Sequence, residues 1–298
     1  DLDELLGSDV DIVVICTPTT SHPDLVQRAA LAGKHIMCEK PMALTMKQCQ
    51  GMIDACAAAG VQLAIGHTIR FFGTFRTVRR LVAEGVIGTP VSGSFDRTNA
   101  AKPRRAGDDA RWTGHWREDA RNSGGSVLEG FIHELDCTRS VFGTVAAVSA
   151  DIAGNQEYDG YLSPQMVQGI VRFESGALVT ARTGSAVGVP SKGYWIGGTE
   201  GGLRFDRWGQ PVLLYRPDQE QPEEVAAEVN NPYTVELEDL LAAIRGDITE
   251  PENSGRNGLE NVGLGLAFYH SCESGTRVHF ADGMPELPEN YQNTRFTF

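Results

Sequence analysis

The sequence predicts a two-part α/β protein, in which a parallel sheet with crossover helices is followed by an α+β part with an open, mainly antiparallel sheet. Two observations lead to this prediction. Residues 10–66 read as strand, helix, strand, helix, strand with short connections, the order of a parallel sheet with right-handed crossovers. After Gly85 the pattern changes to alternating strands and turn signals, which is typical of antiparallel pairing. We therefore expect two domains, 1–85 and 86–298.

In the first part, strands are expected at residues 10–16, 35–38 and 61–66. The first of these, VDIVVIC, is a near-continuous β-branched run, which favours a strand buried on both faces. The sequence Ser21-His22-Pro23 is a helix start, and that helix should end at Gly33. Thr45 is expected to cap a second helix that ends at Gly60.

The second part is expected to hold short strands at residues 91–98, 166–173, 177–183, 203–205 and 212–215. The residues Glu174-Ser175-Gly176 separate two of these runs and predict a hairpin. Apolar residues at helical spacing predict helices at 125–141, 235–245 and 258–272.

Composition excludes several classes of function. The chain has 298 residues, with 26 Lys and Arg against 39 Asp and Glu, a net charge of −13. This charge argues against nucleic acid or an anionic membrane surface as a partner. There is no apolar run of the length that spans a bilayer, no signal-peptide pattern and no CxxC pair. We expect a cytoplasmic protein without a disulfide framework.

Polar residues follow each of the first three predicted strands. Thr17-Pro18 with His22 follows the first, Glu39-Lys40-Pro41 the second, and residues 66–71 the third. Ligands of open α/β sheets bind at the carboxyl ends of the strands, where loop amides and helix N-termini are available. Each segment alone also fits an ordinary connection or a surface ion pair. Together on one edge of a sheet they favour a shared cleft.

A second candidate lies in the segment Glu129-Gly130-Phe131-Ile132-His133. On an α-helix, residues i and i+4 share a face, so this carboxylate and imidazole can form a hydrogen bond. The carboxylate would fix the tautomer of the imidazole and favour its protonated form, which suits a general acid/base. A pair on the helix surface, or a metal site completed by Asp136, fits the same spacing. Gly124-Gly125 precedes the segment and allows close backbone approach.

Taken in order, these segments resemble the successive signatures of the Gfo/Idh/MocA family of sugar and cyclitol oxidoreductases, and the resemblance covers nearly the whole chain. The matching motifs are Thr17-Pro18 with His22, Glu39-Lys40-Pro41, Arg70-Phe71, EGVIGTP at 84–90, Gly124-Gly125, Glu129 with His133 and Asp136, and GTEG at 198–201. The resemblance implies a Rossmann-type parallel sheet that is N-terminally incomplete, because the family's GxGxxG turn is absent and roughly 60 residues are expected before Asp1. The family usually has Asp where this chain has Glu129.

The resemblance implies hydride transfer between NAD or NADP and a secondary hydroxyl or ketone of a sugar, sugar derivative or cyclitol. It implies that His133 is the acid/base, that Glu129 orients it, and that Lys40 forms a hydrogen bond to the reacting oxygen, without a metal. Residues expected to bind the cofactor are Thr17, Pro18, His22, Glu39, Lys40, Arg70, Trp116, Arg117 and Tyr233. A homo-oligomer, a dimer or tetramer formed through the open sheet, is expected. Redox-assisted glycoside cleavage and a non-catalytic dinucleotide-sensing regulator are the alternatives on this fold.

Overall fold

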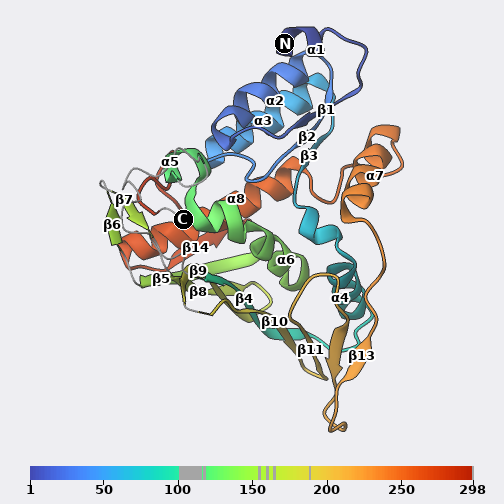
Figure 1. The fold of residues 1–298 in the computed structure, drawn as a ribbon, viewed down its shortest axis with the longest axis vertical. Helices are drawn as coiled ribbons and strands as arrows, with labels where there is room; N and C mark the ends of the chain where they lie inside the picture. Colours follow the sequence, from blue (N-terminus) through green and yellow to red (C-terminus); the bar gives the residue numbers. More distant parts are fainter. Residues whose placement is uncertain are drawn as a thin grey trace.

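The computed structural model describes residues 1–100, 116, 119–153, 156–158, 161–163, 166–187 and 189–296. Figure 1 shows an elongated molecule with three short strands and their helices at one end and a large sheet at the other. Helices α6 (Ile132–Phe142) and α8 (Gly255–Ser274) lie between these two parts. The arrangement confirms the predicted fold class, a parallel sheet followed by an open, mainly antiparallel one.

The N-terminal part contains a three-stranded parallel sheet in the order β1-β2-β3. Its elements are α1 (Leu2–Leu6), β1 (Ile12–Ile15), η1 (Thr19–Ser21), α2 (His22–Leu31), β2 (His35–Cys38), α3 (Met46–Ala59), β3 (Leu63–Ile65), η2 (Thr68–Phe71) and α4 (Gly73–Ala83). The predicted cap is confirmed, because Thr45 accepts a hydrogen bond from the Gln48 amide and Gln48 bonds back. Gly60 ends α3 in the left-handed conformation, with φ at 68°.

The prediction that the first strand is buried on both faces is wrong for the described chain. Val13 and Ile15 are buried, but the side chain of Val14 is 57% exposed. Helix α2 packs against β1; Val13 and Ile15 share one face of the strand, and Val14 points to the opposite face, where its side chain stays exposed. A β-branched run shows that a strand suits burial, while actual burial depends on what lies against each face.

The large sheet has ten strands in the order β13-β12-β11-β10-β4-β9-β8-β5-β14-β15, and β4 with β9 is the parallel pair among otherwise antiparallel neighbours. These strands are β4 (Pro90–Ala100), β5 (Val145–Ala153), β8 (Met166–Phe173), β9 (Leu178–Val187), β10 (Lys192–Gly198), β11 (Gly202–Phe205), β12 (Val212–Tyr215), β13 (Glu223–Val225), β14 (Val278–Ala281) and β15 (Met284–Pro285). A separate pair is formed by β6 (Gln156–Tyr158) and β7 (Tyr161–Ser163). The predicted hairpin between β8 and β9 is confirmed.

The helices of this part differ from prediction at one place. The expected continuous helix over 125–141 is instead α5 (Ala120–Ser123), π-helical turns η4 (Val127–Phe131) and then α6. Gly124 and Gly125, both near φ +80°, separate α5 from η4. A Cβ on Gly125 would lie 2.2 Å from the Phe296 carbonyl oxygen, so this close approach requires glycine. Helices α7 (Pro232–Arg245) and α8 occur where expected.

Helix α8 and the segment before it join the two parts. The Ile65 amide donates to the Asn253 carbonyl (2.8 Å), and Ala64 forms a bridge with Ser254. Gly258 of α8 lies against Ile65, where a Cβ would come within 2.7 Å of its side chain. The C-terminal third of the chain therefore packs directly on β3, at the edge of the small sheet.

Candidate active site

The loops after β1, β2 and β3 meet at one edge of the small sheet. The Glu39 amide donates to the Ile15 carbonyl (2.9 Å), and the Gly66 amide donates to the Cys38 carbonyl (2.8 Å). The Glu39 carboxylate lies so close to Gly66 that a Cβ there would be 3.3 Å away. Thr17 and Pro18 are exposed beside them. The shared edge predicted from the sequence is thus formed.

His22 connects the loop after β1 with the loop after β2. Its ring is buried, with Nε2 2.9 Å from the Thr17 carbonyl oxygen and Nδ1 3.1 Å from the Pro41 carbonyl oxygen. Met42 contributes a further carbonyl oxygen 3.3 Å from Nδ1. The imidazole therefore contacts backbone on both sides, and it supports the loop that carries Lys40.

Lys40 reaches across from the small sheet to the second part of the chain. Its amino group donates to the backbone carbonyl of Glu129 (2.6 Å) and to the Glu129 carboxylate (3.1 Å). The two side chains are 15% and 5% exposed. An ammonium group has three donors, so one N–H of Lys40 remains for a ligand.

His133 lies at the start of α6, and its environment contradicts the predicted dyad. Within the described residues, Glu129 and His133 share no hydrogen bond, and Nδ1 of His133 is buried without a partner. Because Val127–Phe131 is π-helical, the two residues are not at i and i+4 of one α-helix. The carboxylate instead pairs with the full positive charge of Lys40.

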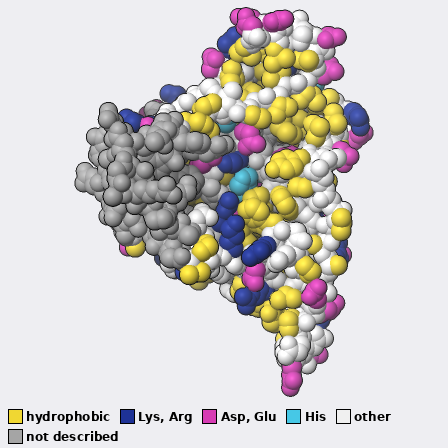
Figure 2. Space-filling model, in the orientation of Figure 1, with side chains coloured by type: hydrophobic (Ala, Val, Ile, Leu, Met, Phe, Trp, Pro, Cys, Tyr) yellow, Lys and Arg dark blue, Asp and Glu magenta, His cyan; other side chains and the backbone are white. Residues whose placement is uncertain are grey.

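The expected effect on the His133 pKa is also wrong. We predicted a pKa above about 6.5 from the neighbouring carboxylate. Loss of water around the ring, together with the Lys40 cation, lowers the pKa of His133 well below 6.5. The imidazole is therefore neutral at pH 7 and able to accept a proton. Figure 2 shows a histidine side chain with basic and acidic groups beside it on the face between the two parts.

Replacement of Glu129 gives a direct test of this pairing. We expect Glu129→Gln to lower the maximal rate, because Lys40 loses its charged partner, while the ionisation of His133 stays below pH 6.5. Glu129→Asp keeps the charge and should cost much less. The measurement is the pH profile of turnover for the three proteins. If the pH limb of turnover moves when Glu129 is replaced by Gln, Glu129 and His133 are electrostatically coupled and the assigned pairing with Lys40 is wrong.

A buried network behind His133 was missed by sequence reasoning. The ring of His67 packs edge-on against His133, with ring centroids 6.1 Å apart. Nε2 of His67 lies 3.2 Å from the amide nitrogen of Asn261, which also donates to Asp136 (2.7 Å). Nε2 is therefore an acceptor and Nδ1 carries the proton. Burial lowers the pKa of His67 to about 4. The signal was its place directly after β3.

Arg70 makes its contacts within the protein. Its guanidinium donates to both oxygens of Asp136 (2.9 and 2.6 Å) and to the Glu252 carbonyl (3.1 Å), and it is buried. This pair holds the pKa of Asp136 well below its usual range. Asp136 is thus engaged and does not join a metal site with Glu129 and His133. The described residues contain no cluster of three or more side chains suited to hold a metal ion.

The other residues predicted to bind the cofactor fall into two groups, one on the edge of the small sheet and one elsewhere. Thr17, Pro18 and Glu39 lie together on the edge described above. Trp116 is half-buried, and Arg117 lies outside the described residues. Tyr233 is 67% exposed in the first turn of α7, and among described residues it has no hydrogen bond to Lys40 or His133.

Glu236 of α7 is a buried acid that sequence reasoning also missed. It accepts hydrogen bonds from Thr68 (2.7 Å) and Asn253 (3.0 Å), and burial raises its pKa to about 7. This folded-state pKa lies above the ordinary value of 4.5, so the folded protein holds the proton more tightly than the unfolded chain. Its contribution to stability is present below about pH 4.5 and is lost as the pH rises through about 7.

We expect Glu236→Gln to remove this loss. Between about pH 5 and about pH 8, the free energy of unfolding should fall less in the variant than in the unsubstituted protein, by on the order of 1–2 kcal/mol. Denaturant unfolding at the two pH values measures the difference. Glu238→Gln, an exposed position on the same helix, is the control. Equal pH dependence in all three proteins would show that Glu236 titrates normally.

Two sequence profiles match the chain. The NAD-binding Rossmann fold of the Gfo/Idh/MocA oxidoreductase family matches residues 1–67, and the C-terminal alpha/beta domain of that family matches residues 79–280. In the described part of the chain, no helix has the length and apolar character needed to cross a membrane.

Individual relatives share this similarity. The 2,7-anhydro-N-acetylneuraminate hydratase of Escherichia coli is 34% identical over 209 residues, which are 69% of this chain but only 54% of that protein. The 1,5-anhydro-D-fructose reductase of Ensifer adhaerens is 28% identical over 95% of this chain and 84% of its own. The aldose-aldose oxidoreductase of Caulobacter crescentus, solved with glycerol, superposes with a TM-score of 0.80 at 29% identity, covering 93% of this chain and 82% of that one.

Proposed function

Since the chain belongs to the Gfo/Idh/MocA oxidoreductase family, we propose that it transfers a hydride between NAD or NADP and a secondary hydroxyl or ketone of a sugar, sugar derivative or cyclitol. One observation supports this reaction above all. The Lys40 ammonium, held on Glu129, and the neutral imidazole of His133 belong to one charged cluster where the two parts of the chain meet. A hydroxyl placed there has a proton acceptor and a donor to its oxygen.

The residues at the edge of the small sheet fit the nicotinamide half of the cofactor. Thr17 and Pro18 are exposed at this edge and would contact the cofactor, and the Glu39 carboxylate at the same edge could accept hydrogen bonds from ribose hydroxyls. His22 would support cofactor binding indirectly, because its ring contacts the backbone of the loop that carries Lys40. Arg70 would do so by fixing the segment after β3 to Asp136. When bound, the cofactor supplies the hydride acceptor or donor.

The chain's own residues manage the proton and the charge on oxygen. In the oxidation direction, the neutral ring of His133 takes the hydroxyl proton. The third N–H of Lys40 donates to the same oxygen and stabilises the negative charge that develops on it. In reduction the imidazolium returns the proton. Glu129 positions Lys40, and His67 packs against the ring of His133.

We assign residues 1–85 to cofactor binding and residues 86–298 to substrate binding and assembly. The names of the relatives indicate sugars as the substrate class. The name of the Escherichia coli relative, a hydratase, favours one alternative: a cycle in which hydride leaves and returns to the substrate, so that no reduced cofactor accumulates. All six cysteines are free thiols, which supports a cytoplasmic location.

The test is a panel of aldoses, sugar acids, anhydrosugars and inositols with NAD and NADP, using the full-length protein. The proposal expects reduced nicotinamide to form with at least one member, and to be lost in His133→Asn. Product analysis by mass detects the cycle without net reduction. If substrate disappears without any need for nicotinamide, the proposal fails.

We also propose a homo-oligomer, a dimer or tetramer, that forms through the open face of the large sheet. On β8, Val167, Val171 and Phe173 are buried under the helices, whereas Ile170 on the opposite face is 50% exposed. Leu178 on β9 is also exposed. A mixed apolar and polar face suits a subunit interface. Sedimentation should give a species larger than a monomer at micromolar concentration, and Ile170→Lys should shift it towards monomer.

A further inference from the structure

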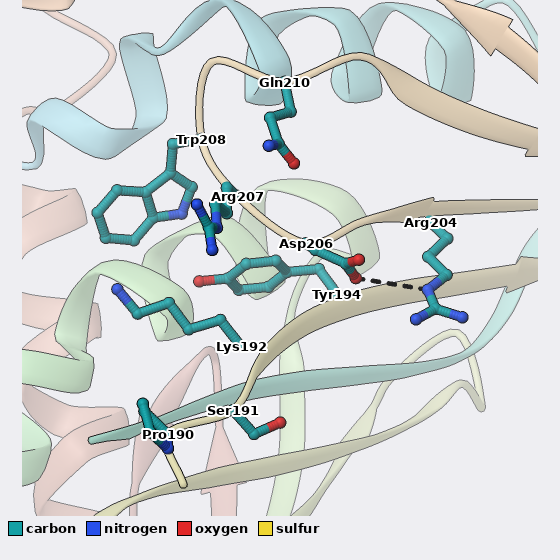
Figure 3. Close-up of a pocket in the computed structure, with 9 residues that line it drawn as sticks. All are labelled: Pro190, Ser191, Lys192, Tyr194, Arg204, Asp206, Arg207, Trp208 and Gln210. Carbon is teal, nitrogen blue, oxygen red and sulfur yellow. Dashed lines mark hydrogen bonds and ion pairs between the residues drawn. The ribbon is translucent and has the colours of Figure 1, made fainter. Parts of the chain in front are cut away.

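A pocket lies at the start of β10, on the large sheet. Its volume is about 920 Å³, and its walls come from β10, β11 and the loop that follows β11. Figure 3 shows that the Lys192 amino group, the Arg207 guanidinium and the Tyr194 hydroxyl point to one region beneath the indole of Trp208. The proposed reaction uses none of these groups.

The charge of this pocket is opposite to that of the protein. The chain has a net charge of −13, yet three cations and one carboxylate line the pocket: Lys192, Arg204, Arg207 and Asp206. Arg204 pairs with Asp206 at 3.4 Å. Among the described residues, neither Lys192 nor Arg207 forms an ion pair with a carboxylate. Two cations without counterions in one cavity favour an anionic ligand.

The polar groups of the pocket are mainly donors. The indole N–H of Trp208 is buried without an acceptor, and Figure 3 shows it on the side that faces Arg207. Tyr194 gives its hydroxyl proton to Glu134 (2.9 Å), so its oxygen is fixed in place. A buried donor without an acceptor is costly, and an acceptor oxygen of a ligand would satisfy the Trp208 N–H, while the exposed Lys192 and Arg207 add positive charge at the mouth of the pocket.

Arg97 of β4 connects the pocket to the proposed reaction site. Its guanidinium donates to the Gly130 carbonyl (2.9 Å), in the turns between Glu129 and His133, and stacks 5.0 Å from the ring of Trp208. The ammonium of Lys192 lies 5.4 Å from the same ring. Figure 2 shows basic side chains extending from a histidine along this face towards the end that carries β11 and β13.

We propose that this pocket binds an anionic substituent, a carboxylate or a phosphate ester, of the same sugar whose hydroxyl reacts at His133. Lys192 and Arg207 would contact its oxygens, and Trp208 would line the sugar or the anion. The inference rests on the proposed function for the identity of the ligand as a substrate. The pocket is lined by residues 190–210 of the large sheet and its loop, whereas the NAD-binding Rossmann fold of the family matches residues 1–67, so we assign the pocket to the substrate and not to the cofactor's phosphates.

The experiment compares sugars that share a ring and differ in charge: D-glucose, D-glucuronate and D-glucose 6-phosphate, with inorganic phosphate as a further probe. Calorimetry measures binding to the full-length protein, and turnover is measured separately with NAD and NADP. The variant is Lys192→Gln with Arg207→Gln. Its control is Lys47→Gln with Arg245→Gln, two exposed positions that remove the same charge elsewhere.

We expect one of the anionic sugars to bind at least about tenfold more tightly than glucose, and the double variant to lose about tenfold or more of that affinity. The control should behave like the unsubstituted protein. Preference for glucose 6-phosphate and phosphate would identify a phosphate ester, and preference for glucuronate a carboxylate.

Equal affinity for neutral and anionic sugars, or equal losses in the variant and the control, would overturn the proposal. The two proposals fail separately. Anion binding that depends on Lys192 and Arg207, with no nicotinamide-dependent turnover, would contradict the proposed reaction and leave the pocket assignment standing. Turnover of neutral sugars without anion binding would do the reverse.

Discussion

Replacement of Lys40 by methionine is expected to lower the turnover number of the full-length protein at least about a hundredfold, while cofactor binding stays largely intact. Methionine has a similar length and no charge, so it removes the donor to the reacting oxygen and leaves the packing of the loop. The amino group donates to the Glu129 carbonyl oxygen (2.6 Å) and to its carboxylate (3.1 Å), which leaves the third N–H for the reacting oxygen. The substitution removes that donor together with the rest of the amino group.

Steady-state kinetics with the best sugar of the panel, together with NADH titration, measures both quantities. Lys34→Met is the matched control, because Lys34 is a half-buried lysine of the same part of the chain whose amino group donates to the Ser8 carbonyl (2.8 Å). Unchanged turnover in Lys40→Met would show that the assigned role of Lys40 is wrong. Lost cofactor affinity with unchanged turnover at saturation would make Lys40 a binding residue instead.

His133→Asn should lower turnover by about 10²–10⁴-fold, the usual cost of removing a general acid/base. The pH dependence gives a sharper result. Because the pKa of His133 is depressed, the unsubstituted protein should lose oxidation activity only below pH 6.5, as the ring becomes protonated. Lys40→Met removes a cation that lowers this pKa, so the residual activity of that variant should show its limb at higher pH.

Pre-steady-state rates of nicotinamide reduction across pH measure both limbs. A limb above pH 6.5 in the unsubstituted protein would mean that a carboxylate governs the imidazole after all. A limb that persists in His133→Asn would assign the ionisation to another group, and Lys40 would be the first to examine.

The parts of the fold that sequence reasoning predicted correctly are those determined by local pattern. Strand ends of a parallel sheet share one edge whatever else the chain does, so the grouping of Thr17, Glu39 and Lys40 followed from three short apolar runs. The capping box of Thr45 with Gln48 is likewise determined within four residues. Fold class needed only the order of strands and helices.

The errors concern partners that are distant in sequence. Two basic residues, His133 and Lys40, are possible partners of Glu129. The partner in the structure is Lys40, which lies 89 residues away in the sequence. The spacing to His133 suggested a local pair, and the π-helical turns changed that geometry. An arginine after a strand end is a common ligand-binding residue, which favoured a cofactor role for Arg70. The structure pairs its guanidinium with the buried Asp136, whose negative charge needs a counterion.

The basic pocket could not be predicted because its residues are unremarkable in sequence. Lys192, Arg204 and Arg207 alternate with apolar residues on two strands and a loop, as surface cations usually do. Only the antiparallel pairing of β10 with β11, and the return of the loop over β10, bring them to one cavity.

The central claim, that a carbinol hydride of a sugar passes to nicotinamide at Lys40 and His133, is tested most directly by isotope transfer. The full-length protein is incubated for a single turnover with NAD and a sugar deuterated at its carbinol carbons, and the nicotinamide is analysed by NMR. We predict deuterium at C4 on one face of the ring, a slowed rate relative to the protiated sugar, and transfer that is about 10²–10⁴-fold slower in His133→Asn. Conversion of the sugar with no deuterium in the nicotinamide would contradict this mechanism.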